Sequence, residues 1–240
     1  MKKNRLIPIV LLKDGWVVQS KDFSQYQNLG NPVTTVKRLS EWASDEIIYI
    51  DISRGDKYDT RRNDQGYKNR GSFLNIIKDV SDIAFMPITV GGKIRTMKDI
   101  EDRLSSGADK ICLNSIAIND TKFINQASKE FGSQCIVISI DAKKNLDNHL
   151  VYSNGGREIT NMTPDEFARI VEDNGAGEIL INSIDRDGSG SGYDIPLIEK
   201  VADSVSIPVI ACGGVGGGGH FSGAFEKTSV DAVAAANVFH

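Results

Sequence analysis

The stretch MPITVGG at residues 86–92 is echoed half a chain further on by IPVIACGG at residues 207–214. Each stretch is a short apolar run that ends in a pair of glycines. An apolar run bounded by turn residues is typical of a strand that is buried on both faces of a parallel sheet. Because the same strand-and-glycine unit stands at corresponding places in both halves, the sequence predicts an internal repeat.

Similar apolar runs alternate along the chain with amphipathic stretches of helical period, which indicates strand–helix units around a parallel sheet. DEII at 45–48 and GEIL at 177–180 match in the same way. A half-length repeat fits a closed barrel better than an open, doubly wound sheet. We therefore expect one (β/α)₈ TIM barrel domain over residues 1–240, built from half-barrels at about 1–130 and 131–240. The expected strands lie at 6–11, 47–52, 86–90, 110–113, 136–140, 178–182, 208–212 and 232–236.

Helices are expected between the strands, with caps at Asn31, Asp120 and Thr163. Two segments depart from this pattern. Residues 53–72 form a long charged segment, which is either a lid or binding loop or a disordered excursion. After the last strand only VFH at 238–240 remains, so the eighth helix is apparently absent, through truncation or because another chain covers the gap. The expected helices include 31–43, 96–106, 121–131, 163–174 and 195–204.

The composition is that of an ordinary globular protein, with 240 residues, 40% hydrophobic and 25% charged. A net charge of −4 without a long basic run argues against a nucleic-acid partner. No apolar stretch approaches the roughly 20 residues that cross a bilayer, and no signal peptide is recognised, so we expect a cytoplasmic protein without a membrane partner. Cys112, Cys135 and Cys212 lie in apolar runs, as small buried hydrophobes do, and no metal or cofactor is expected.

In a barrel of this kind the functional site is built from the loops after the strands. Glycine-rich loops follow the expected third, sixth and seventh strands. Glycine lets backbone N–H groups approach an anion, although tight turns also need it. The matched positions in both halves favour binding of a phosphorylated small molecule. The predicted phosphate-binding residues are Gly91, Gly92, Asn114 and Ser115 in the first half, and Gly188, Gly213, Gly214, Ala236 and Asn237 in the second.

Ionisable side chains stand at both ends of the strands. Asp51, Asp141, Asp185 and Asp187 follow strands, and Asp141 is expected to point to the barrel mouth. A carboxylate there suits a general acid or base, although an aspartate also caps turns. At the opposite strand ends, two basic and two acidic residues suggest a salt-bridged ring, and that face of a barrel usually serves stability. The ring residues are Arg5, Glu46, Lys110 and Glu178.

These motifs make the chain resemble, over essentially its whole length, the cyclase subunit of imidazole glycerol phosphate synthase. That family is a (β/α)₈ barrel lyase that pairs with a glutaminase, whose ammonia travels along the barrel axis to a phosphorylated substrate. The resemblance implies that Arg5, Glu46, Lys110 and Glu178 form the ammonia gate and that Asp109 lies at the glutaminase-docking face. The motifs are RLIP at 5–8, KDG at 13–15, TVGG at 89–92, GADK at 107–110, FGSQCIV at 131–137, IDAK at 140–143, DRDG at 185–188 and VFH at 238–240.

The mouth of the barrel departs from the family pattern. The family uses two opposed aspartates, and Asp141 matches the second, whereas Leu11 stands at the first. A leucine transfers no proton, so chemistry that needs both carboxylates is not expected. Three further positions differ: Gln19 replaces a lysine, Lys93 a glycine, and Asn237 a small hydroxyl residue.

An intact gate beneath an altered mouth favours ammonia delivery with changed chemistry. Relatives of this kind occur beside enzymes that amidate sugars for surface polysaccharides, and the chain resembles that branch. The main expectation is therefore a subunit that passes ammonia from a glutaminase partner to a separate sugar amidotransferase. The alternatives are a genuine cyclase of histidine biosynthesis, in which Asp141 works with Asp185 or Asp187, a non-catalytic docking scaffold for a glutaminase, and a generic phosphate-binding isomerase barrel.

Overall fold

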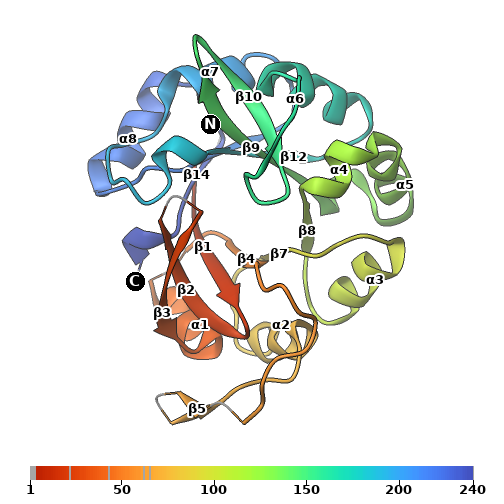
Figure 1. The fold of residues 1–240 in the computed structure, drawn as a ribbon, viewed down its shortest axis with the longest axis vertical. Helices are drawn as coiled ribbons and strands as arrows, with labels where there is room; N and C mark the ends of the chain where they lie inside the picture. The colour runs from red at the N-terminus through yellow and green to blue at the C-terminus, as the bar shows by residue number, and fades with distance from the viewer. Residues whose placement is uncertain (1–3, 22, 43, 62, 65, 240) are drawn as a thin grey trace.

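The computed structural model describes residues 4–21, 23–42, 44–61, 63–64 and 66–239. Its parallel strands pair side by side around a central axis, and the last strand pairs with the first, so the sheet is closed (Figure 1). The predicted parallel α/β barrel is thereby confirmed. In barrel order the strands are β1 (Arg5–Lys13), β4 (Ile47–Asp51), β7 (Ile88–Gly91), β8 (Lys110–Leu113), β9 (Ile136–Asn145), β12 (Glu178–Ser183), β13 (Val209–Cys212) and β14 (Ala232–Ala235).

Helices surround the strands, and their starts follow the predicted caps. The Asn31 side chain accepts the N–H of Val33 at 2.9 Å, and Thr163 forms a capping box with Glu166. None of the described helices is long and apolar enough to cross a membrane. The helices are α1 (Pro32–Glu41), α2 (Phe73–Ser81), α3 (Met97–Ser105), α4 (Ser115–Asn119), α5 (Thr121–Phe131), α6 (Pro164–Asp173), α7 (Ile195–Ala202) and α8 (Gly218–Lys227); residue 43, the expected end of the first helix, lies outside the described residues.

The barrel strands bury both of their faces, which explains their almost continuous apolar sequences. Successive side chains alternate between the axis and the helices. On β1, Ile7 and Ile9 belong to the axial cluster, whereas Val10 and Leu12 pack in the outer one. The axial cluster consists of Ile7, Ile9, Ile48, Cys112, Val137, Leu180, Ile210, Ala232 and Ala234.

The starts of two strands are fixed by the same pair of contacts. The Asp109 carboxylate accepts the N–H of Ile88 at 2.8 Å, and its own N–H donates to the Ile88 carbonyl at 2.9 Å. Asp231 repeats both bonds with Val209, each at 3.0 Å. A buried strand end would otherwise leave a donor unpaired, so these aspartates satisfy the backbone where the strands begin.

The sequence did not predict the antiparallel additions to the barrel. A hairpin, β2 (Trp16–Lys21) and β3 (Gln25–Gly30), follows β1, while β10 (Asn148–Ser153) and β11 (Glu158–Ile159) extend β9. The run of glycines after β13 was expected to be a loop, but α8 begins within it, at Gly218. Three short 3₁₀ turns, η1 (Ser133–Cys135), η2 (Ile184–Arg186) and η3 (Asn237–Phe239), complete the described fold, and η3 directly follows β14.

The charged segment at 53–72 is ordered where it leaves the barrel. Its described part includes β5 (Asn63–Asp64) and β6 (Tyr67–Lys68), which protrude from the barrel in Figure 1. Tyr58 and Asn69 are buried, and the Asn69 amide donates to the Asp14 carbonyl at 3.0 Å. The described part of the segment therefore fits a loop anchored at the barrel mouth rather than a disordered excursion.

The close approach of backbone at Gly92 gives a stability prediction. Gly92 has φ +99°, and a Cβ there would lie 2.2 Å from the Asp51 carbonyl oxygen. Gly92→Ala should lower the free energy of unfolding by roughly 3 kcal/mol, since strain and overpacking both apply. Gly155 has φ +64° and its Cβ would meet no described atom within 4 Å, so Gly155→Ala should cost only about 1 kcal/mol. Urea unfolding measures both variants, and an equal loss of unfolding free energy in the two would contradict this explanation.

Candidate functional site

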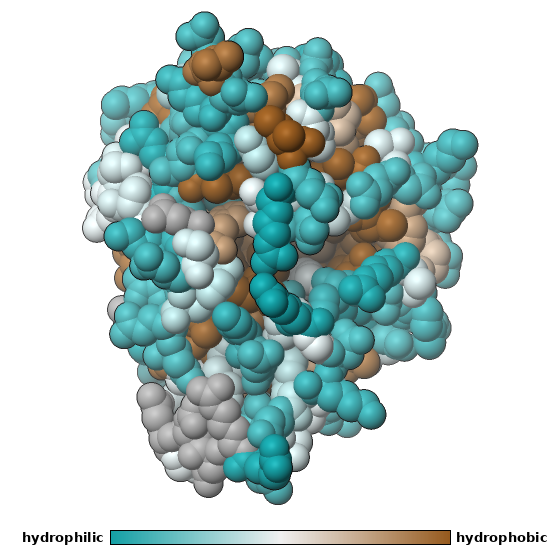
Figure 2. All heavy atoms as spheres, viewed as in Figure 1, coloured by the Kyte–Doolittle hydropathy of each residue, from teal (hydrophilic) through white to brown (hydrophobic). Residues whose placement is uncertain are grey.

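A cavity of about 730 Å³ opens where the barrel strands end. Apolar side chains, among them Ile9, Leu11 and Leu180, form part of its lining and meet the axial cluster. Figure 2 shows a hollow at the centre of the molecular face, with apolar residues in brown inside it and hydrophilic ones in teal reaching across it. A cavity of this size, which combines polar and charged groups with an apolar base, is typical of small-molecule sites.

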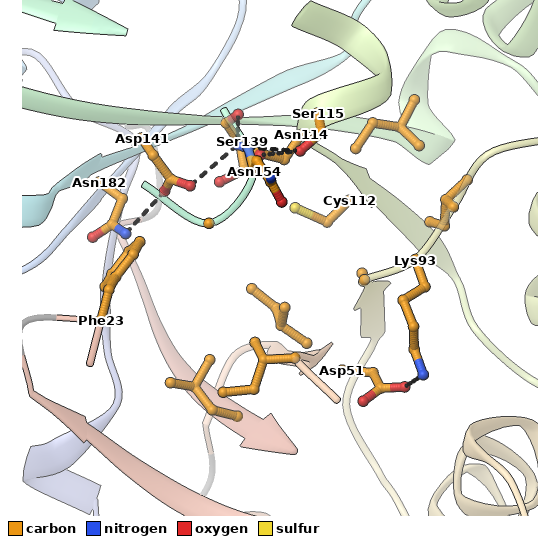
Figure 3. A pocket seen from close by; sticks show the side chains of 18 of the residues that line it. Phe23, Asp51, Lys93, Cys112, Asn114, Ser115, Ser139, Asp141, Asn154 and Asn182 are labelled. Atoms are coloured by element: carbon orange, nitrogen blue, oxygen red, sulfur yellow. Dashed lines mark hydrogen bonds and ion pairs between the residues drawn. The ribbon is translucent and has the colours of Figure 1, made fainter. Parts of the chain in front are cut away.

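Asp141 is the buried carboxylate of this cavity. It lies on β9, is 8% exposed, and accepts hydrogen bonds from Asn182 at 3.1 Å and Asn114 at 3.2 Å (Figure 3). Burial raises the pKa of the Asp141 carboxyl to about 6, and the charge of Asp187 adds to that rise, while the two amide bonds oppose it. A carboxyl that titrates near neutral pH is suited to proton transfer.

Asp187 also lines the cavity, and it holds the β2–β3 hairpin. Its carboxylate accepts the Ser20 hydroxyl at 3.1 Å and the N–H of Phe23 at 3.3 Å. Asp185, the other acidic candidate in this loop, instead accepts the N–H of Lys144 at 2.7 Å and does not line the cavity. The structure therefore brings Asp187, rather than Asp185, together with Asp141.

Leu11 occupies the end of β1, where the family pattern has its first aspartate. It lines the cavity, is partly buried, and lies beside Ile50 of the neighbouring strand. The side chain thus adds apolar surface at this wall and supplies no proton-transferring group.

A buried ion pair closes the wall between β4 and β7. Lys93 Nζ lies 2.7 Å from the Asp51 carboxylate, whose side chain is 0% exposed, and donates to the Gly55 carbonyl at 2.6 Å. The Tyr58 hydroxyl donates to the same carboxylate at 2.7 Å, and burial, with the charge of Asp51, raises the tyrosine pKa. Sequence reasoning noted Asp51 and Lys93 separately but missed their contact. Figure 3 shows the pair across the cavity from Asp141.

The predicted phosphate-binding residues of the two halves differ in whether they line the cavity. Those of the first half, Gly91, Gly92, Asn114 and Ser115, all line the cavity, whereas only Ala236 does so from the second. The backbone of Gly214 bonds to Gly192, and the Asn237 amide donates to the Ser20 carbonyl at 3.1 Å. Gly188, Gly213, Gly214 and Asn237 thus lie outside the lining, and the second-half phosphate site stays a prediction.

The four charged residues at the opposite end of the barrel form a closed ring of contacts. Arg5 bridges Glu46 and Glu178, and Lys110 bridges the same two carboxylates at 3.1 and 3.0 Å. Burial would lower the pKa of Lys110, but Glu178 and Glu46 outweigh that effect and raise it. The structure thus assembles the ring residues as a unit. Asp109, which precedes Lys110 in the chain, is exposed, and its carboxylate accepts the N–H of Ile88 at the start of β7.

No group of three or more His, Cys, Asp or Glu side chains that would suit a metal ion occurs within the part of the chain that the structure describes. Cys112 and Cys212 line the cavity from opposite halves of the barrel, and burial raises the pKa of the Cys112 thiol to about 12. Both thiols are therefore protonated at neutral pH, and the structure offers no activated nucleophile at these positions.

A family model and two named relatives match this chain over essentially its whole length. The family model described as "Histidine biosynthesis protein" matches residues 5–240. Two proteins named "Imidazole glycerol phosphate synthase subunit HisF", from Hydrogenobaculum sp. (strain Y04AAS1) and Bacillus cereus (strain G9842), are each 42% identical over 241 residues. The alignments cover 100% of this chain and 91% of each relative.

These similarities correct the main functional expectation. Transfer of ammonia to a sugar for surface polysaccharide was inferred from a few departures around the mouth, chiefly Leu11. That interpretation is wrong, because the family model and the two relatives named as subunits of imidazole glycerol phosphate synthase support the alternative in histidine biosynthesis. A substitution at one wall of the cavity is outweighed by a match that covers the whole chain. The chain belongs to the histidine biosynthesis protein family.

Proposed function

We propose that this chain is the cyclase subunit, a lyase, of an imidazole glycerol phosphate synthase, and that it takes ammonia from a glutaminase subunit. The observation that carries the proposal is Asp141, a buried carboxyl with a pKa of about 6, which faces a substrate-sized cavity above an apolar axis. The charged ring lies at the opposite end of that axis. Full-length similarity to synthase subunits supports the same activity.

Asp141 transfers protons during cyclisation, and Asp187 supplies the second carboxylate. Asn114 and Asn182 donate to the Asp141 oxygens, so their bonds favour the ionised form and aim it at the cavity. Asp187 lines the same cavity and is close enough for its charge to affect the pKa of Asp141. This pair replaces the opposed aspartates of the family, one of which is absent at Leu11.

Ammonia reaches the cavity from the ring end of the axis. The ring of Arg5, Glu46, Lys110 and Glu178 is the gate, and the glutaminase docks around it, near Asp109. Beyond the ring the axial cluster is apolar and includes the small side chains of Ala232 and Ala234. An apolar lining suits uncharged ammonia, since it provides no polar group that would hold the molecule. The phosphorylated substrate meets the glycine loops after β7 and β13, and the matched Asp109 and Asp231 contacts support duplication of an ancestral half-barrel.

The direct test is formation of imidazole glycerol phosphate from the synthase substrate and ammonium. The unaltered chain should form product, and Asp141→Asn should lower kcat at least about 100-fold, because general acid–base catalysis supplies that much. Asp185→Asn is the matched control and should keep kcat within about twofold, since Asp185 lies outside the cavity lining and its carboxylate accepts from the Lys144 backbone. Lack of product from the unaltered chain would contradict the proposal.

The pH profile tests the ionised form of Asp141. The surrounding amides donate hydrogen bonds to a carboxylate, so the unprotonated form is the base, and kcat/KM should rise with pH through about 6.

Leu11→Asp should raise the rate by less than about tenfold if Asp187 is the second carboxylate. A 100-fold gain in Leu11→Asp would show that Asp187 does not take that part.

The same group predicts a pH-dependent stability. The pKa of Asp141 is raised from 3.8 to about 6, so the folded protein binds an extra proton between these values and loses stability as pH rises through the window. At pH 8 Asp141→Asn should be more stable than the unaltered protein by up to about 3 kcal/mol, and the difference should vanish below pH 4. Urea unfolding at both pH values measures it. A variant that is equally stable at pH 8 would contradict the assigned pKa shift.

The ring gives a separate prediction about ammonia. Glu178→Gln removes one of the two negative charges that Arg5 and Lys110 share. With a glutaminase subunit present, the rate with glutamine should fall at least about fivefold relative to the rate with ammonium. Glu199→Gln, an exposed change on α7, is the matched control and should leave the ratio of the glutamine-dependent rate to the ammonium-dependent rate unchanged. If Glu178→Gln keeps the ratio too, the ring is a structural network only.

A further inference from the structure

Three of the charged side chains that line the cavity are arginines. Among the described lining residues, Arg54 follows β4, Arg95 follows β7, and Arg157 lies in the turn between β10 and β11. All three are exposed at the rim. Asp141 lies within β9, and Asp187 follows η2 with its carboxylate bound to Ser20 and Phe23. Lys93 and Asp51 form an ion pair of their own, so the three arginines supply the uncompensated positive charge.

Arg157 is brought to the first half of the barrel by the turn that carries it. The N–H of Asn154 in this turn donates to the Ser115 hydroxyl, just after β8, at 3.1 Å. The adjoining Gly156 lies against the Phe23 ring, where an added Cβ would come within 3.1 Å. The turn is therefore fixed over the first-half loops, although its strands belong to the second half-barrel.

Arg54 and Arg95 extend from equally fixed backbone. Ser53, next to Arg54, accepts the N–H of Asp14 at 2.7 Å, and on the other side the Gly55 carbonyl accepts from Lys93. The N–H of Arg95 donates to the Asp99 carboxylate at 2.9 Å. Mobile side chains on rigid backbone lose less entropy on binding than side chains on a mobile loop, which favours a binding role.

The guanidinium groups of these three arginines form no hydrogen bond or ion pair with any residue that the structure describes. Arg54 and Arg157 both lie close to Tyr26: burial and the charge of Asp187 raise the pKa of the Tyr26 hydroxyl, and both positive charges oppose that rise. The like charges of Arg54 and Arg157 repel one another, so an anion placed between them would be bound favourably. Guanidinium groups match phosphate oxygens in geometry as well as in charge.

We propose that Arg54, Arg95 and Arg157 form an anion clamp that binds a phosphate group of the substrate and directs its reacting part towards Asp141. This clamp rests on the proposed function for the identity of the substrate. It sets the direction in which an elongated phosphorylated molecule lies in the cavity, with the phosphate over the loops after β4 and β7. The backbone amides of Gly91 and Gly92 lie on the same side.

The test uses binding of inorganic phosphate and pyrophosphate, measured by calorimetry, to Arg54→Gln, Arg95→Gln, Arg157→Gln and the triple variant. Each single change should weaken pyrophosphate binding roughly threefold to tenfold, and the triple change at least about 30-fold, since each removes a charged hydrogen-bond donor. Higher salt should weaken binding less in the triple variant than in the unaltered protein. Arg61→Gln, in the same loop but paired with Asp59 outside the cavity, is the matched control and should bind as before.

Turnover separates the clamp from the proposed reaction. In the single variants KM should rise several-fold while kcat stays within about twofold, because the clamp binds substrate without entering the chemistry. A triple variant that binds pyrophosphate like the unaltered protein would overturn the clamp, whatever its activity. Arginine-dependent binding in a protein that forms no imidazole glycerol phosphate would keep the clamp and reject the reaction.

Discussion

Closure of the sheet is the constraint on which the other features depend. β14 pairs with β1 and β8 with β9, so no barrel strand has a free edge and every second side chain must face the axis. The axis is filled by the apolar cluster, with the charged ring at one end and the cavity at the other. Asp141 is buried because it continues the inward-facing series of Val137 and Ser139 on β9, and burial in turn raises its pKa.

Much of the fold was predictable because the barrel strands carry a strong local signal. β8 and α5 have the expected bounds, and the other barrel strands differ from expectation by a few residues at their ends. The β2–β3 hairpin was missed because it lies outside the closed barrel, and most of β3 is exposed and polar, so no apolar pattern marks it. The start of α8 was missed because glycine is a poor helix former, and tertiary packing decides there.

The candidate site was predictable where it follows from strand ends and not where it depends on folding. Asp141 and the ring could be placed by counting residues from the strands. The Lys93–Asp51 pair joins two loops. The anion clamp depends on a turn of the second half-barrel that contacts the loops of the first half-barrel. Neither contact leaves a local pattern in the sequence. The function was misjudged for a related reason: the missing carboxylate at position 11 was visible in the sequence, whereas the folded chain was needed to show that Asp187, rather than Asp185, lines the cavity with Asp141.

The ring also has a consequence for charge selection. Each of its four carboxylate oxygens accepts from Arg5 or Lys110, and the positive and negative charges of the ring balance. An ammonium ion that approached the axis would meet carboxylates already paired with Arg5 and Lys110, and it would have to shed its hydration shell before it met an apolar lining. Uncharged ammonia faces a much smaller desolvation cost. Under the proposed function, an electrically neutral ring therefore discriminates between the two protonation states of the same nitrogen, and the barrel receives its nucleophile already free of the proton that would make it inert.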